Sequence, residues 1–261
     1  MKFTSLLTAG ALASTLISPA IMAADTASAS LSDAQKKEIE KVIHDYLINN
    51  PEVLLEASQA LQQKQQQNMQ QQAQAAIQEN AEQVFQGKLT TVGNPKGNVT
   101  LVEFFDYQCI HCKKMASTIE NLVKKDSGLR VIYKEFPIFG KTSDLASRVA
   151  LAAGMQGKYQ AMHNALITID KRLDEKTVMD AAKSIGLDMQ KLKKDMDSQE
   201  VTDILDANRQ LAEKLHLMGT PAFIIGSTPD GQYKKGSEIS FIPGATSEQS
   251  LRELIKKAAG N

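Results

Sequence analysis

Apolar and polar positions divide the second half of the chain into alternating strands and helices. The mainly apolar run 99–105 is short, which is typical of a buried strand. A helical pattern follows from Cys109 to about Lys125, and a second strand pattern covers 131–136. A strand, a helix and a strand of these lengths predict a right-handed parallel unit.

A block of helices and a closing hairpin complete this region. The pattern is helical throughout 143–217, and the segments 223–225 and 239–242 then predict two paired strands. A final helix is expected at 247–259. This order predicts an α/β protein with a thioredoxin-like fold and a helical domain inserted at about 143–217.

Residues 32–86 form a separate, all-helical arm. Ser32 followed by Gln35 is a capping-box signature, and apolar residues then recur at helical spacing. Asn50-Pro51 ends this helix, because the residue before proline avoids the helical conformation, while proline suits a new first turn.

The second helix of the arm is predicted from Glu52 to about Gln86, on the order of 50 Å long. A polar segment, 62–68, separates two apolar patches, Leu54, Ala57 and Leu61, then Met69, Ala73, Ala76, Ile77 and Val84. Such a rod has no core of its own. We expect its patches to pair with those of another copy, most simply in a homodimer, although a solvated Gln-rich spacer is the alternative. Turn residues mark 87–98 as a linker.

The N-terminus has the features of a targeting signal. Lys2, the apolar stretch 6–17 and small residues near Ala23 are typical of a signal peptide, 1–23, followed by a flexible tail, 24–31. A membrane anchor is the alternative, but the stretch is shorter than the roughly 20 residues that span a bilayer. We therefore expect export to the periplasm, an oxidising compartment.

The formal net charge of the chain gives little information about its partners. The 30 basic and 30 acidic residues give a formal net charge of zero, so the bulk charge suggests neither nucleic acid nor an anionic membrane as a partner.

Cys109 and Cys112 are the only cysteines in the chain. A bridge between them closes so small a loop that it would constrain the unfolded chain little, so reactivity explains the pair better than stapling does. Half of a zinc site is another alternative, but the remaining histidines, His44, His163 and His216, lie far apart in helical patterns. We expect no metal, and no cofactor beyond the Cys109–Cys112 disulfide.

The position of the pair suits exchange chemistry. Cys109 would lie at a helix N-terminus, where free backbone N–H groups and the helix dipole favour a thiolate. A protonated His111 would stabilise that thiolate further, and Lys113 and Lys114 add positive charge. Cys112 lies one turn further in and suits the resolving thiol.

Segments 102–112 and 219–221 resemble the active site and the cis-proline loop of the DsbA family of oxidoreductases. The resemblance runs from Val99 to the C-terminus, which delimits a DsbA-like domain at 99–261. It implies that Cys109 is the nucleophile and Cys112 the resolving thiol.

The resemblance also implies roles for residues around the pair. Pro221 would be the cis proline beside the disulfide. Glu103 would match a buried acid that helps to move the proton of the resolving cysteine, whereas its place in the strand also allows an edge-facing carboxylate.

The sequence departs from DsbA in three places. Ile110 stands where DsbA has proline, which leaves the redox potential open. Thr220 precedes the proline, as in the isomerases DsbC and DsbG, where DsbA has valine. The arm 32–86 has no counterpart in monomeric DsbA and resembles the oligomerisation segments of dimeric or trimeric relatives.

The sequence thus predicts an oligomeric periplasmic thiol–disulfide oxidoreductase that forms or isomerises disulfides in exported cysteine-containing proteins. A DsbB-like or DsbD-like membrane partner would reset it. The alternative is an oligomeric holdase chaperone with incidental thiols, which predicts aggregation suppression that survives the loss of both cysteines.

Overall fold

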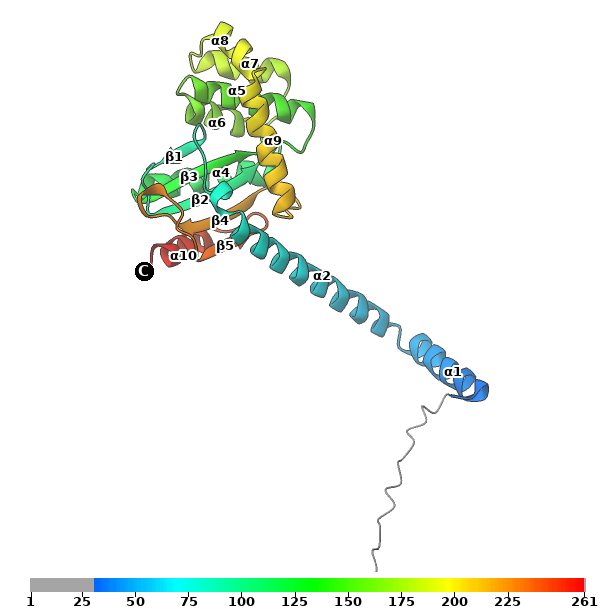
Figure 1. Ribbon diagram of the computed structural model, residues 1–261. Coiled ribbons are helices and arrows are strands. Elements are labelled where there is room, and N and C mark those ends of the chain that lie inside the picture. The colour runs from blue at the N-terminus through cyan, green and yellow to red at the C-terminus, as the bar shows by residue number, and fades with distance from the viewer. Residues whose placement is uncertain (1–30, 261) are drawn as a thin grey trace, which may run out of the picture. The chain divides into compact units, whose positions relative to one another are not determined.

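The computed structural model of the chain describes residues 31–260 (Figure 1), so the predicted signal peptide and nearly all of the predicted tail lie outside the described residues. The chain divides into two compact units at residue 60, and each unit is described by itself. Among the helices of 31–260, none is long and apolar enough to cross a membrane.

The first unit contains α1 (Asp33–Asn49) and the start of α2 (Glu52–Glu79). The predicted capping box is confirmed, because Ser32 Oγ accepts the Gln35 N–H and the Gln35 side chain accepts the Ser32 N–H. No residue of α1 is buried. Its apolar positions, Ile39, Val42, Ile43 and Tyr46, are therefore open to solvent in the single chain.

The second unit is built on a five-stranded sheet in the order β1-β3-β2-β4-β5 (Figure 1). Its strands are β1 (Thr91–Gly93), β2 (Val99–Phe105), β3 (Leu129–Glu135), β4 (Ala222–Ser227) and β5 (Ile239–Ile242). The predicted parallel pair is confirmed in β2 and β3, joined by α4 (Ile110–Lys125), and the predicted hairpin in β4 and β5. The predicted α/β order is therefore correct.

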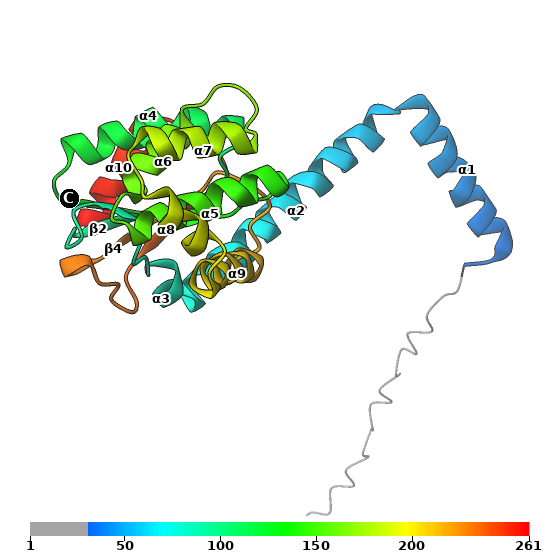
Figure 2. The ribbon, with the colours of Figure 1, turned by 90° about the horizontal axis from the view of Figure 1, so that it is seen from above.

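The predicted helical block lies between β3 and β4. It contains α5 (Lys141–Met155), α6 (Tyr159–Ile167), α7 (Glu175–Ser184), α8 (Met189–Met196) and α9 (Gln199–Lys214). Figures 1 and 2 show α5 to α8 grouped together, with α9 returning towards the sheet. A short 3-10 turn, Pro229–Gly231, precedes β5, and α10 (Glu248–Ala259) ends the fold.

The central strands present alternate side chains to two different cores. One face carries Leu101, Glu103 and Phe105 of β2 with Val131, Tyr133 and Glu135 of β3, and its apolar members pack with α4, α6 and α10. We call this the α4 face. The other, the α3 face, carries Val102 and Phe104 with Arg130, Ile132 and Lys134, and packs against α3 (Ala81–Val84), the end of α2 and α9.

The end of the arm differs from the prediction. The expected single helix stops at Glu79, and α3 follows as a separate turn. Ala73, Ile77 and Val84 are buried against the α3 face of their own chain. The expectation that these residues pair with another copy is therefore wrong, because the sheet already covers them.

Phe85 fixes this junction. Its ring stacks on Tyr233 with centroids 5.1 Å apart and lies over Gly226 in β4. A β-carbon at Gly226 would come within 2.6 Å of the ring. The close approach requires a glycine near the end of the strand.

The predicted linker 87–98 also contains a strand. Residues 91–93 form β1, which pairs antiparallel with β3 through Thr91–Ile132 and Gly93–Arg130. The predicted turn follows, where the Gly97 N–H bonds to the Asn94 carbonyl at 2.9 Å. The segment is therefore an edge of the sheet as well as a connection.

Candidate active site

Cys109 and Cys112 lie in the first turn of α4, where the chain leaves the central strand β2. Cys109 is the N-cap residue, and its carbonyl accepts the Lys113 N–H at 3.1 Å. Both cysteines are free thiols with little exposure, 4% and 1%. The helix thus begins at Cys109, as the sequence predicts.

The loop before β4 brings Thr220 and Pro221 to the same sulfur. The Thr220–Pro221 peptide bond is cis, as the resemblance implies. The Cys109 thiol donates to the Thr220 carbonyl, with the sulfur 3.3 Å from the oxygen. Thr220 Oγ1 is buried and makes no hydrogen bond. Two segments that are far apart in the sequence therefore meet at Cys109.

The two thiols have opposite acidities. The hydrogen bond from Cys112, with smaller contributions from Thr220 and from the backbone N–H groups of Cys112 and His111, lowers the pKa of Cys109 to about 5 against the opposing effect of burial. The hydrogen bond to Cys109, then burial and the nearby Glu103 carboxyl, raises the pKa of Cys112. At neutral pH this arrangement holds a thiolate at Cys109 and a protonated thiol at Cys112.

The side chains of His111 and Lys113 do not stabilise the Cys109 thiolate in the way that the sequence predicts. The His111 side chain is exposed, and His111 contributes to the lowered pKa of Cys109 through its backbone N–H. Lys113 Nζ donates to the Ile169 carbonyl after α6. Stabilisation of the thiolate thus comes from the neighbouring thiol and the helix backbone.

Glu103 lies on the α4 face, below the pair. Its strand is flanked by β3 and β4, so the alternative of an edge-facing carboxylate is excluded. The side chain is buried, and Oε1 has no hydrogen-bond partner. Burial, and then the charges of Cys109 and Glu135, raise the pKa of Glu103 well above its usual value. A buried carboxyl group with a raised pKa therefore lies near the cysteines.

Asp106, which the sequence reasoning missed, holds the loop that leads into Cys109. Its buried carboxylate accepts the Gln108 N–H and the Ser143 hydroxyl at 2.7 Å each. It also accepts the Ile138 and Phe139 N–H groups at 2.7 and 3.0 Å. Four hydrogen bonds to one carboxylate fix the approach to the helix.

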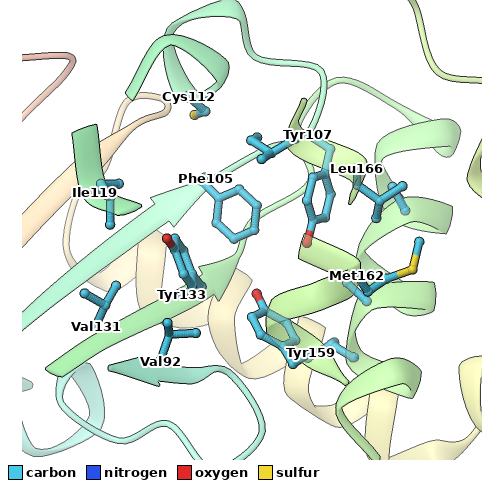
Figure 3. Packing of buried hydrophobic residues seen from close by; sticks show 14 of the residues in the cluster. Val92, Phe105, Tyr107, Cys112, Ile119, Val131, Tyr133, Tyr159, Met162 and Leu166 are labelled. Carbon is cyan, nitrogen blue, oxygen red and sulfur yellow. The ribbon is translucent and has the colours of Figure 1, made fainter. Parts of the chain in front are cut away.

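A second missed group lies deeper on the α4 face. The hydroxyls of Tyr107 and Tyr159 point towards each other in Figure 3, and both donate to Glu135 Oε1, at 3.0 and 2.7 Å. Tyr107 Oη also lies 3.3 Å from His163 Nδ1. Charged residues within a strand, Lys134 and Glu135, were the available sequence signal, because a strand covered on both faces buries every side chain.

A groove begins at the cis-proline loop. It has a volume of about 360 Å³ and runs between Thr220-Pro221, the end of β5 and the second half of α2. Met69 of α2 and Phe241 of β5 contribute to its wall, and Met218, 85% exposed, stands at its side. An extended chain bonded to Cys109 would have this mostly apolar surface next to it.

Two protein families match parts of the chain. Residues 100–256 match the DsbA-like thioredoxin domain family. Residues 35–68 match the family described as the copper resistance protein ScsC N-terminal domain.

Solved and curated proteins agree with the first match. The chain is similar to BcfH of Salmonella enterica Typhimurium, with 32% identity, 87% of this chain and 97% of that chain covered, and a TM-score of 0.71. A thioredoxin-like oxidoreductase from Silicibacter pomeroyi shares 36% identity, covering 69% and 98%, with a TM-score of 0.62. DsbA of Bordetella parapertussis shares 31% identity over 146 residues, which is 50% of this chain and 64% of that protein.

The chain spans between 25% and 64% of the length of the first curated relatives that it matches. The DsbA-like family model itself covers more than half of the chain, from β2 through α10. The predicted thioredoxin-like fold with a helical insert is therefore confirmed, and the chain belongs to the DsbA family of thiol–disulfide proteins.

Proposed function

We propose that the protein is a periplasmic thiol–disulfide oxidoreductase acting on exported cysteine-containing proteins through Cys109 and Cys112. The observation that supports this proposal most strongly is the opposite acidity of the two thiols in one helical turn. The pKa of Cys109 is lowered to about 5, and that of Cys112 is raised. A thiolate beside a protonated thiol can attack a disulfide and then be released by its neighbour.

In the oxidising direction, a client thiolate attacks Cys109 Sγ and the Cys109–Cys112 bond breaks. Cys112 leaves with the electron pair and takes a proton, for which Glu103 is the nearby buried source. A second client thiolate then attacks the client sulfur of the mixed disulfide and releases Cys109 as a thiolate. The client loses two electrons, and the cysteine pair gains them.

In the reverse direction, the Cys109 thiolate attacks a client disulfide. If another client thiol resolves the mixed disulfide, the client is isomerised and the pair stays reduced. If Cys112 resolves it, Cys112 loses its proton and the client is reduced. Thr220, which matches the isomerase pattern, favours including isomerisation in the proposal.

Single substitutions test the chemistry. Cys109→Ser should abolish both oxidation and reduction of a model peptide disulfide, because no other thiolate lies at the site. Cys112→Ser should accumulate the mixed disulfide, visible as an adduct by mass spectrometry. Exchange that persists in Cys109→Ser would refute the proposal, and aggregation suppression that survives loss of both cysteines would favour a holdase.

The direction of electron transfer between the client and the cysteine pair depends on the membrane partner. A DsbB-like oxidase would keep the pair oxidised, whereas a DsbD-like reductant would keep it reduced. Trapping the cysteines of periplasmic protein with a thiol-specific mass tag separates the two, because only the reduced pair takes up two tags.

We also propose that the arm mediates homo-oligomerisation, with a dimer as the simplest case. Five large apolar side chains of α1 are exposed in the single chain, and burying them against another copy would be favourable. Val42→Glu combined with Tyr46→Glu should lower the particle mass measured by light scattering, whereas Lys41→Glu should not. An unchanged mass in the double variant would remove this role from α1.

A further inference from the structure

Glu135 is a fully buried carboxyl group that the proposed chemistry does not use. It ends β3 with no exposed surface. Both hydrogen bonds to its carboxyl group come from tyrosine hydroxyls and converge on Oε1. Oε2 is buried and makes no hydrogen bond that meets normal geometry, while the Ser147 hydroxyl lies close enough to lower the pKa of the carboxyl group. An ionised carboxylate would therefore lack part of the hydrogen bonding that normally accompanies burial of charge.

No positive group of the described chain balances this carboxyl group. It is faced by Tyr107 from the loop after β2, by Tyr133 from β3, by Ser147 from α5 and by Tyr159 and His163 from α6, with the acids Glu103 and Asp106 acting from further away. Burial lowers the pKa of His163 to about 3, so His163 is neutral. Burial also raises the pKa of Glu135 to about 8, and the hydroxyls that face it offset this only in part.

The cations of the same strand lie on the other face of the sheet. Arg130 donates to the carbonyls of Phe85 and Gly231. Lys134 donates to those of Gln83 and Gln86. Neither cation can therefore neutralise an acid on the α4 face.

Tyr107 connects this carboxyl group to the nucleophile. It stands two residues before Cys109, in the loop that Asp106 holds in place. Its ring packs edge-on against Phe105, with centroids 4.9 Å apart (Figure 3). The Cys109 N–H bonds to the Asp106 carbonyl at 3.1 Å. A change in the strength of the hydrogen bond between Tyr107 and Glu135 would thus act on the N-cap of α4 through the two peptide units between Tyr107 and Cys109.

We propose that Glu135 is a positioning residue of the redox site, a second buried acid whose protonation state sets the reactivity of Cys109 through Tyr107. The proposal rests on the thiol exchange proposed above. With Glu135 neutral, its bonds to Tyr107 and Tyr159 are ordinary hydrogen bonds. On ionisation they become charge-assisted and shorten, and the added negative charge makes the Cys109 thiolate more basic.

A more basic thiolate is a better nucleophile. A rise of one unit in the pKa of a thiol that is already ionised increases its attack rate roughly threefold. Alkylation of Cys109 in the reduced protein should therefore rise twice with pH. The first rise, near pH 5, reports ionisation of Cys109. The second, near pH 8, reports ionisation of Glu135.

The test measures iodoacetamide alkylation of Cys109 by peptide mass spectrometry between pH 4 and 10, with folding checked by circular dichroism at each pH. Glu135→Gln keeps an acceptor oxygen for both tyrosines but cannot ionise. It should keep the first rise and lose the second. Tyr159→Phe removes one donor to the carboxylate and should move the second rise to higher pH, which a merely structural role of Glu135 would not do.

Glu103→Gln is the matched control, because Glu103 is the other buried acid of the α4 face. The second rise should persist in this variant. If it disappears there and remains in Glu135→Gln, it belongs to Glu103 and the proposal is overturned. A wild-type profile with only the rise near pH 5 would also overturn it while leaving the exchange function intact. Absence of the rise near pH 5 would instead contradict the exchange function.

Discussion

The two faces of the sheet bury ionisable groups of opposite type, acids on one face and bases on the other. The α4 face carries Glu103 and Glu135, and within residues 31–260 no cation bonds to either of them. The α3 face carries Arg130 and Lys134, and neither bonds to a carboxylate of the described chain. Adjacent residues of one strand, Lys134 and Glu135, therefore point their charges into two separate cores.

The two faces satisfy their charges differently. Lys134 Nζ donates to the Gln83 carbonyl at 3.1 Å and to the Gln86 carbonyl at 2.7 Å, at the end of α3. The cation thereby ties α3 to the sheet. On the α4 face, Glu103 Oε1 and Glu135 Oε2 stay unpaired. Charge on the α3 face stabilises the fold, whereas the unpaired acids lie where a proton has to be held close to the cysteines.

The largest expected effects come from cavities made on each face. Ile77 on the α3 face and Ile119 of α4 are both fully buried. Ile77→Ala and Ile119→Ala should each lower the free energy of unfolding by about 2–4 kcal/mol in urea titrations. Only Ile119→Ala should also change the alkylation rate of Cys109, because Ile119 is on the buried side of α4, the helix that begins at Cys109. Altered Cys109 reactivity in Ile77→Ala would show that the faces are not independent.

A smaller effect should come from Glu135. Its folded-state pKa of about 8 exceeds the ordinary 4.5, so the folded state binds the proton more tightly. Stability is therefore lost as the pH rises from 4.5 to 8. Across that window, the stability of Glu135→Gln should rise steadily relative to that of the wild type. The control is Glu120→Gln, at an exposed position. If the stability difference from the wild type does not change with pH in either variant, the description of Glu135 as a buried acid is contradicted.

Lys134 should give the smallest effect at neutral pH and the opposite slope. Burial lowers its pKa from 10.5 to about 8, so the unfolded state holds the proton over that interval. The wild type should gain stability relative to Lys134→Met between pH 8 and 10.5. At pH 7, lost hydrogen bonds and relieved desolvation oppose each other, and the net change should stay within about 1 kcal/mol. The exposed Lys124→Met should show no slope of this kind, and a slope of the same sign as for Glu135 would break the comparison.

Local chemistry made much of the fold predictable. The run 99–105 has no polar alternation and is buried on both faces, so its apolar sequence identifies it as a strand. Ser32 and Gln35 start α1 through contacts three residues apart. The placement of Cys109 at the start of α4 also depends on neighbours in sequence.

What the sequence did not reveal depends on partners that are distant in the chain. An apolar stripe such as Ala73 and Ile77 has the same spacing whether it packs on another copy or on its own sheet. β1 has three residues and is defined by its pairing with β3, so no periodicity could identify it. The Glu135 cluster joins a loop, a strand and α6, and only the tertiary fold brings these segments together.

The glycine at position 226 limits how this chain can vary. Because any β-carbon there would meet the Phe85 ring at 2.6 Å, every other amino acid must displace the segment that follows α3. The position is closed to substitution for a reason unrelated to electron transfer. In a library of single substitutions sorted first for folding and then for disulfide exchange, variants of Gly226 should be lost at the first step, whereas those of Cys109 should pass it and fail at the second.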